Sequence, residues 1–319
     1  MTICLLRHLR SSLRVHLLWL LLIASNAFAQ NWESPHYRDH PLVGKIWDTE
    51  KNSWITEKQL RVELLEYNYV LLGETHKNID HHLLQARMVN SLVEAGAKPT
   101  VVMEMLAVEA WKDQPTTWTN LETLKEQAKI RNDGWQWDLY APILQSVVQH
   151  RLKLKAGNIE SKALHTWSNK AGSYTPEEVF AEYWIAPGDF KQLKRDVIKS
   201  HCGHANTAFV QFMARAQLQR DRIMTHALIS NKSPVVLIAG AGHVRNNYAI
   251  PMNLLNKYQR LSYISVAFTP EHPERLNPED YLGDVSKAFD ILYFTPSYTN
   301  QDPCVQFRKQ LQKMRKTNT

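Results

Sequence analysis

Tyr69-Val70-Leu71-Leu72-Gly73-Glu74-Thr75-His76 is the stretch that decides the fold of this chain. Its first four residues form a short apolar run, which is typical of a strand buried on both faces of a parallel sheet. The glycine lets the backbone turn, so Glu74 and His76 fall on the loop at the strand's carboxyl end. Ligands and catalytic groups of open α/β sheets gather at that end. The stretch therefore predicts a strand and a candidate site together.

Two other apolar runs carry polar residues at a similar place. Residues 235–239 are followed by Gly240-Ala241-Gly242-His243, so two predicted strands end in Gly-x-x-His. A third run, residues 100–105, contains Glu104. A buried carboxylate without a partner is costly, so we expect Glu104 to lie against a histidine, an arginine or a metal ion. We predict that His76, Glu104 and His243 converge at one end of the sheet.

Helical patterns alternate with these runs. Asp80 is a predicted N-cap for a helix through Val93, in which Leu84, Met88 and Leu92 share one stripe. Further strands are predicted at residues 152–158, 263–268 and 288–294, and residues 31–56 are expected to form an irregular arm. The alternation predicts an α/β fold with a mostly parallel central sheet flanked by helices.

A helical insertion is predicted at about residues 159–205, where strand signals are missing. Within it one helix is expected to start at residues 176–178 and another to cover residues 190–198. Residues 209–229 are the longest predicted helix, with Arg220 and Asp221 on its polar side. We therefore expect residues 30–319 to form a single domain that carries this insertion.

The N-terminus has the features of a cleaved signal peptide covering residues 1–29. Three arginines, at positions 7, 10 and 14, precede an apolar core at 17–24, and Ala27-Phe28-Ala29 is a cleavage site. The residue directly after that site is Gln30 and not a cysteine, so we do not expect a lipid anchor. The prediction is a periplasmic or secreted protein.

Charge and cysteine content narrow the class further. Removing residues 1–29 takes away three arginines and no acids, so the net charge falls from +7 to +4. Basic residues do not cluster with aromatic ones, so we expect no nucleic-acid partner. Cys202 and Cys304 remain in the mature chain. An exported protein permits a disulfide between them, but two separate thiols are an equal alternative.

Several of these features together resemble the ChaN-like haem-binding proteins, which share a superfamily with the Tiki metalloproteases and the erythromycin esterases. The resemblance covers about residues 60–296. The matching features are the Gly73–His76 loop, Gln85, the Glu104 strand, Gly134 to Pro142, His201-Cys202-Gly203, Gln217, Arg220-Asp221, Gly240–His243 and Phe294-Thr295-Pro296. The resemblance implies haem binding in bacterial iron uptake by an exported protein.

The resemblance also carries four site residues, Glu74, His76, Glu104 and His243. In the Tiki-like branch such residues would hold a divalent metal such as zinc, which activates water. In the esterases a His and a Glu would act on water as general bases. In a haem protein the same residues would form a polar network beneath the pocket.

Haem requires an apolar slot and an axial donor. The resemblance makes a tyrosine the expected donor. Tyr140 is our candidate, because an exposed hydroxyl in this aromatic turn could reach an iron while Trp135 and Trp137 wall the porphyrin. The alternative is a core aromatic whose hydroxyl tip reaches solvent. Other candidate ligands are Tyr37, His201 and His204, although a His-Cys-Gly-His loop is more often a capped turn. Arg220 and Arg245 are candidates for the haem propionates, with ordinary salt bridges as the simpler interpretation.

Two functions follow from the sequence. The first is a periplasmic haem-binding protein of haem and iron acquisition, with an outer-membrane or periplasmic haem-transport component as its partner. The second is a metal-dependent hydrolase that acts on a peptide or an ester. The sequence leaves the oligomeric state open, a homodimer included.

Overall fold

A computed structural model describes residues 31–131, 134–171, 185–257, 261–282, 287–302, 304–305, 307–309 and 312. The predicted signal peptide at 1–29 and the helix start predicted at 176–178 lie outside these residues. None of the helices that are described combines the length and apolarity needed to cross a bilayer.

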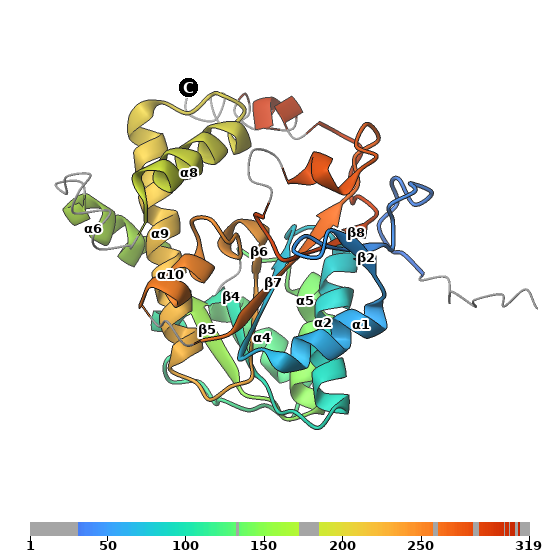
Figure 1. The fold of residues 1–319 in the computed structure, drawn as a ribbon. Coiled ribbons are helices and arrows are strands. Elements are labelled where there is room, and N and C mark those ends of the chain that lie inside the picture. Colours follow the sequence, from blue (N-terminus) through green and yellow to red (C-terminus); the bar gives the residue numbers. More distant parts are fainter. Residues whose placement is uncertain are drawn as a thin grey trace, which may run out of the picture. The chain divides into compact units, whose positions relative to one another are not determined.

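A mixed sheet of eight strands runs through the described part of the chain in the order β2-β1-β8-β7-β3-β6-β4-β5 (Figure 1). Its strands are β1 (Ile46–Asp48), β2 (Ser53–Ile55), β3 (Tyr69–Glu74), β4 (Thr100–Ala107), β5 (Leu154–Asn158), β6 (Val235–Gly240), β7 (Tyr263–Pro270) and β8 (Ile291–Thr295). All pairs among β3 to β8 are parallel, whereas β1 pairs antiparallel with β2 and with β8. The mostly parallel α/β class is confirmed.

Strand β3, formed by Tyr69–Glu74, lies in the middle of the sheet. β3 lies between β7 and β6, and Glu74 is in register with Gly240 of β6. On the other side of β6, Met103 of β4 pairs with Ile238. The carboxyl ends of β3, β6 and β4 are therefore neighbours at one end of the sheet. This neighbourhood is what positions the site.

The N-terminal arm is more regular than predicted. Residues 46–48 and 53–55 form β1 and β2, which extend the sheet beyond β8. Each has only three residues, so neither shows an apolar run or a full alternation. Trp47 of β1 packs edge-on against Trp54 of β2, with ring centroids 4.8 Å apart. Tertiary pairing, not local sequence pattern, makes these two strands.

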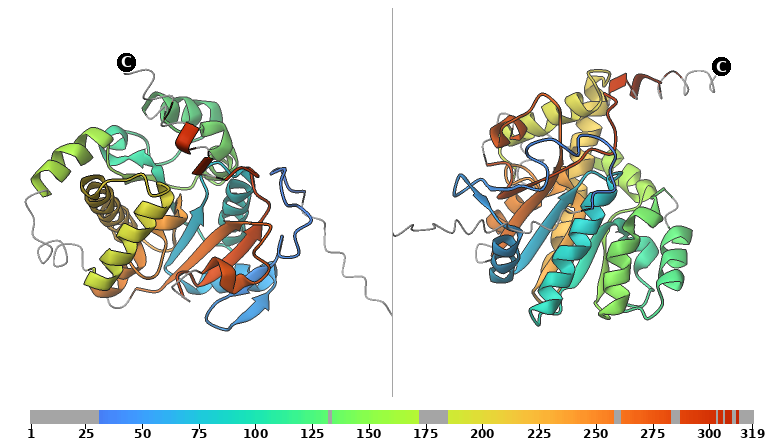
Figure 2. Two further views of the ribbon diagram at one scale, coloured as in Figure 1. Left: turned by 90° about the horizontal axis from the view of Figure 1, so that it is seen from above. Right: turned by 90° about the vertical axis from the view of Figure 1, so that its right-hand side faces the viewer.

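Helices cover both faces of the sheet (Figure 2). The helices that the structure describes are α1 (Glu57–Glu63), α2 (Ile79–Glu94), α3 (Val108–Trp111), α4 (Leu121–Arg131), α5 (Trp137–Gln149), α6 (Ser161–Ala171), α8 (Pro187–Ser200), α9 (Thr207–Ile229) and α10 (Ile250–Lys257), with short 3₁₀ turns η1 (Leu64–Glu66), η2 (Ala241–His243) and η3 (Pro278–Tyr281). Because side chains of a strand alternate, Val70 and Leu72 pack with the α2 and α5 core. Leu71 packs on the opposite face, with α9 and α10.

The start of α2 differs from the prediction. Asn78, not Asp80, is its N-cap, and the Asn78 side chain accepts a hydrogen bond from the Asp80 N–H. The Asp80 carboxylate instead accepts the backbone N–H groups of Glu33 and Ser34, at 2.8 and 2.9 Å. Asp80 thus holds the N-terminal arm on the domain. The predicted apolar stripe of this helix is buried as expected.

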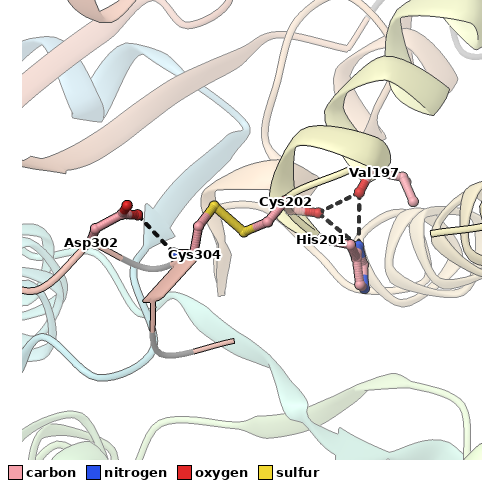
Figure 3. Close-up of a disulfide and its surroundings, with 6 residues drawn as sticks. Val197, His201, Cys202, Asp302 and Cys304 are labelled. Atoms are coloured by element: carbon pink, nitrogen blue, oxygen red, sulfur yellow. Dashed lines mark hydrogen bonds between the residues drawn. A yellow bond between two sulfur atoms is a disulfide. The ribbon is translucent and has the colours of Figure 1, made fainter. Parts of the chain in front are cut away.

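The predicted insertion is helical where it is described. α8 packs Phe190, Leu193 and Val197 against Val210 and Ala214 of α9, in a small core of its own. Cys202, two residues after α8, forms a disulfide with Cys304, and their Cα atoms are 5.4 Å apart (Figure 3). The bond ties the C-terminal segment to the turn between α8 and α9, and it decides the question that the sequence left open.

Candidate functional site

Glu74, the last residue of β3, is buried and holds three ring side chains. Its Oε1 accepts the Tyr140 hydroxyl at 2.8 Å and lies 2.8 Å from His76 Nδ1. His82 Nδ1 lies 2.7 Å from the other oxygen. Burial raises the pKa of Glu74, but the charges and hydrogen bonds of His82 and His76 outweigh it and bring that pKa to about 2. Glu74 is therefore a carboxylate at any physiological pH.

A second network surrounds His243. Its Nδ1 lies 2.5 Å from Asp221 Oδ1 on α9, and its Nε2 lies 3.3 Å from Glu104 Oε1 on β4. Burial lowers the pKa of His243, but the two carboxylates outweigh it and raise that pKa to about 10. Burial raises the pKa of Asp221 to about 6 in spite of this neighbour. We therefore describe His243 as a buried imidazolium between two acidic groups.

Glu104 is inside its strand rather than at its end, because β4 continues to Ala107. Its Oε2 accepts the Gly240 backbone N–H at 2.8 Å. Burial raises the pKa of this carboxyl, but His243, His76 and the Gly240 amide together bring it far below its usual range. The partner that the sequence required for Glu104 is thus a histidine and a backbone amide.

The two networks meet at Gly240. A Cβ placed on this glycine would lie 2.9 Å from His76 Cε1 and 3.6 Å from Glu104 Oε2. The imidazole of His76 thus lies directly on the Gly240 backbone, in space that any side chain would fill. The predicted convergence of His76, Glu104 and His243 at one end of the sheet is confirmed.

His76 is the member of this cluster that reaches solvent. Its side chain is 42% exposed, whereas that of Glu74 is 0% exposed. Its Nδ1 is engaged by Glu74, and no hydrogen bond joins its Nε2 to another described residue. The ring packs edge-on against Trp135, with centroids 4.9 Å apart. A carboxylate that orients one ring nitrogen makes the other a good electron donor, so Nε2 can act as a base or bind an iron.

Burial lowers the pKa of His76, but the hydrogen bond to Glu74 and the charge of Glu104 outweigh it and raise that pKa above its ordinary value. A proton on Nε2 therefore competes with any ligand of this nitrogen.

The hydroxyl of Tyr140 is not exposed, as it would have to be to bind the iron of a haem that enters from solvent. Its side chain is fully buried, and its hydroxyl donates to Glu74. Burial, the charge of Glu74 and this hydrogen bond all raise the pKa of Tyr140 far above the usual range. Trp135 and Trp137 flank it, with ring centroids 6.1 and 5.9 Å away. Tyr140 is a core aromatic, but both of our interpretations gave it a hydroxyl that reaches solvent, and that part of each was wrong.

Two members of the site were not among the predicted site residues. His82, on α2, contacts Glu74 and packs at a tilt against Tyr140, with ring centroids 4.2 Å apart. Asp221 was expected on the polar side of its helix but is fully buried against His243. His82 lies near the start of one predicted helix, and Asp221 lies next to Arg220 in another. Neither position indicates from the sequence alone that the side chain belongs to the site. Their partners come from elements distant in the sequence.

Within the described residues, none of the remaining candidates forms a hydrogen bond or ion pair with Glu74. His201 closes α8 and packs against Phe209 and Phe307, and His204 also stacks near Phe307. The Arg245 guanidinium lies over the rings of Tyr248 and Phe289, at 5.0 and 5.5 Å. Arg220 acts on the network electrostatically, since its charge lowers the pKa of Asp221 against the effect of burial.

The donor set does not fit a protein-bound divalent metal. Among the residues that the structure describes, no three His, Cys, Asp or Glu side chains are arranged to hold one. The oxygens of Glu74 and Glu104 already accept hydrogen bonds or face imidazole nitrogens, and both nitrogens of His243 face carboxylates. The alternative of a zinc site at Glu74, His76, Glu104 and His243, which the resemblance to the Tiki-like branch implied, therefore has no support from the geometry.

A cavity of about 490 Å³ opens beside Trp135, at the junction of α4 and α5. It is lined by Glu122, Lys125, Glu126, Lys129, Trp135, Gln136, Trp137, Asp138 and Leu139. Lys125 pairs with Asp138 at 3.0 Å, while Lys129 is exposed. Trp135 thus contacts the His76 ring and also lines a cavity that offers aromatic surface and cationic side chains.

Comparison with known proteins agrees with this fold. The family described as haem-binding uptake, Tiki superfamily, ChaN matches residues 60–254, which is more than half of the chain. A structure described as cofacial heme binding to ChaN of Campylobacter jejuni shares 21% identity at a TM-score of 0.63, over 78% of this chain and 95% of that one. A mutant of the erythromycin esterase EreC in its open conformation shares 14% identity at a TM-score of 0.43, over 81% and 99%. A search among curated proteins finds no match.

The fold and the site thus define an α/β protein with a histidine and carboxylate cluster at the carboxyl ends of its central strands. This chain belongs to the ChaN family of haem-binding uptake proteins in the Tiki superfamily.

Proposed function

We propose that this protein binds haem in the periplasm and takes part in iron acquisition, and that His76 is the iron ligand. The observation that carries the proposal is the exposed Nε2 of His76 in a chain of the haem-binding family. Imidazole held by a second hydrogen bond is a common axial donor. The position of His76 beside Gly240, where the carboxyl ends of the central strands meet, supports this assignment.

The surroundings of His76 fit the other needs of haem. Trp135 offers an aromatic wall next to the ring. The adjoining cavity adds Trp137 and Leu139, and Lys125 and Lys129 are cations suited to the propionates. Tyr140 would act indirectly, because its hydroxyl helps to fix Glu74 and thereby the orientation of His76. When bound, the haem iron supplies the ligand-binding and redox chemistry.

The periplasmic location has two supports. The first is the signal-peptide pattern of residues 1–29. The second is the Cys202–Cys304 disulfide, because such bonds persist in oxidising compartments such as the periplasm. A protein that binds haem there would pass it to a transport component of the cell envelope.

The test is a titration of purified apo-protein with hemin. We expect a Soret band that saturates, and the same band at the same affinity in a His226→Ala control, because His226 is an exposed residue of α9. A flat titration with no protein-bound band would overturn the proposal.

A second function, hydrolysis of an ester or a peptide without a protein-bound metal, is favoured by one observation. His76 is oriented by Glu74 with its other nitrogen exposed, which is also the arrangement of a general base. Hydrolysis of ester and peptide substrates that persists in chelator, is lost in His76→Ala and occurs without a Soret band would select this function over haem binding.

A further inference from the structure

One face of α8 carries a stripe of basic residues. Lys191, Lys194, Arg195 and Lys199 recur at helical spacing, and Ile198 lies among them. The opposite face is buried through Phe190, Leu193 and Val197. Spacings of three and four residues place side chains on the same side of a helix, so the four cations and the isoleucine form one surface, which we call the α8 stripe.

The cations of the α8 stripe are not neutralised within the described part of the chain. No carboxylate pairs with any of the four there; Arg195 donates to Gln192, and Lys194 lies 5.0 Å over the Phe190 ring. Asp196 is the acid closest to them in sequence, and it is engaged by the Tyr248 hydroxyl at 2.8 Å and by Gln192. The positive charge of this surface is therefore available to an external anion.

Exposed apolar side chains accompany the charge. Ile198 is 41% exposed and Phe209, at the start of α9, is 39% exposed. Between α8 and α9 lies a groove of about 270 Å³, lined by Lys191, Lys194, Arg195, Ile198, Ala205, Thr207, Val210 and Gln211. Cationic and apolar groups thus share one surface feature.

The disulfide adds the C-terminal segment to the same corner of the protein. Cys304 is bonded to Cys202 (Figure 3). Phe307 packs against His201, with ring centroids 5.7 Å apart. Arg308 and Lys309 follow directly and are exposed. Two more cations are thereby held beside the end of α8.

We propose that the α8 stripe, with Ile198 and Phe209, is a docking surface for an anionic phospholipid bilayer. Lysine and arginine beside exposed apolar side chains is the pattern of helices that lie at the headgroup level of a membrane. Each such cation contributes about a fivefold gain in partitioning onto an anionic surface. An acidic protein would match the charge, but it would not require the exposed apolar pair. The proposal does not depend on haem binding.

The test is co-sedimentation of the full, disulfide-bonded protein with lipid vesicles at low and at high salt. We expect binding to vesicles of phosphatidylcholine mixed with phosphatidylglycerol, weak binding to phosphatidylcholine alone, and loss of binding at high salt because salt screens exposed charges. Equal binding to both vesicle types, or none to either, would overturn the proposal.

Variants assign the binding to this surface. Lys191→Glu with Arg195→Glu should reduce partitioning onto the anionic vesicles by at least about tenfold. Lys58→Glu with Lys98→Glu changes the net charge equally at exposed positions of α1 and of the loop before β4, and it should have a much smaller effect. Ile198→Asn should weaken binding while its salt dependence persists. All variants should keep the wild-type circular dichroism.

Two results would contradict the assignment. If the two charge-reversal pairs lower vesicle binding equally, net charge rather than the α8 stripe governs it. If the protein ignores vesicles but binds poly-glutamate through Lys191 and Arg195, the surface is a site for an acidic protein partner, and the membrane proposal is wrong.

Discussion

Glu74 fixes the orientation of the exposed histidine in this site. It accepts the Tyr140 hydroxyl and lies within hydrogen-bonding distance of His76 and His82, so its charge is balanced by rings on three different segments. Burial and the neighbouring His82 lower the pKa of His81 to about 3, which leaves that ring neutral. His81 accepts the Thr75 N–H at 2.8 Å and so fixes the loop that carries His76. Function and loop geometry therefore depend on the same few residues.

A first prediction concerns Tyr140. The Tyr140→Phe variant keeps the ring but leaves Glu74 without one donor, so the free energy of unfolding should fall by about 1.5–3 kcal/mol, as for a hydrogen bond to a charged group. Urea denaturation measures this. The ferric haem spectrum should keep the wild-type band positions, because Tyr140 is not the ligand. A changed ligand spectrum in this variant would restore the tyrosine hypothesis.

A second prediction follows from the charge of His243. Its folded pKa of about 10 is above the ordinary 6.5, so it contributes stability that is complete below pH 6.5 and is lost as pH rises towards 10. The raised pKa of Asp221, about 6, acts at lower pH and does not share this window. We expect the free energy of unfolding of the wild type to fall steadily over the alkaline range.

The matched variant is His243→Gln. It should lose about 3–5 kcal/mol at neutral pH, because two buried carboxylates lose their cation, and it should show a shallower alkaline decline. Denaturation at neutral pH and near the pKa of His243 measures both. An alkaline slope as steep in the variant as in the wild type would assign the decline to other groups.

Single residues at strand ends could be predicted from the sequence, and their partners could not. Glu74, Glu104 and His243 lie within or directly after apolar runs. The rules of parallel sheets therefore predict that they lie at the same end of the sheet. His82 and Asp221 lie within helices, where only packing shows that they face inwards. For Tyr140 the aromatic turn suggested an exposed hydroxyl, but the α2 and α5 interface buries it. A short motif does not reveal the depth at which it is buried.

At the scale of elements, the close contact of β3 with the turn after β6 decides how the two networks meet. A Cβ on Gly73 would lie 2.4 Å from Val244 Cγ2 and 2.9 Å from Ala241 Cα. Backbone therefore packs on backbone at this point, and only a glycine allows it. The apolar run and its glycine predicted the strand, whereas the need for glycine in the contact is visible only in the structure.

A third prediction tests this contact. Gly73→Ala should lower the free energy of unfolding by about 1–3 kcal/mol or more, as overpacking does. The control is Gly188→Ala in the first turn of α8, where a Cβ meets nothing within 4 Å and the change should be neutral or slightly stabilising. Thermal unfolding compares the two. Similar melting temperatures for both variants would show that the Gly73 contact is looser than described.

At the scale of the whole molecule, two features join segments that are far apart in the sequence. They are the disulfide and the antiparallel pairing of β1 with β8. The bond closes a loop with a sequence separation of 102 residues. β1 and β2 attach the N-terminal arm to β8, near the end of the chain. Neither feature could be derived from local patterns, because both depend on pairings between distant segments, whereas the parallel core could be derived from its apolar runs.

A fourth prediction concerns this closure. Replacing Cys202 and Cys304 together by serine should lower the free energy of unfolding by about 2–4 kcal/mol, because the unfolded chain gains freedom. Urea denaturation of oxidised wild type and of the variant measures it. In protein isolated from the periplasm both thiols should resist alkylation until a reductant is added. Free thiols in that fraction would contradict the bond.

The central claim is that His76 is the axial ligand of a bound haem. The most direct measurement is the absorption spectrum of the ferric haem complex of His76→Ala, recorded with and without added imidazole. We predict that the variant loses the wild-type Soret position and binds hemin at least about tenfold more weakly, as expected when one metal ligand or its support is removed. Added imidazole should restore the wild-type spectrum. A His76→Ala complex whose spectrum and hemin affinity match those of the wild type would contradict the claim.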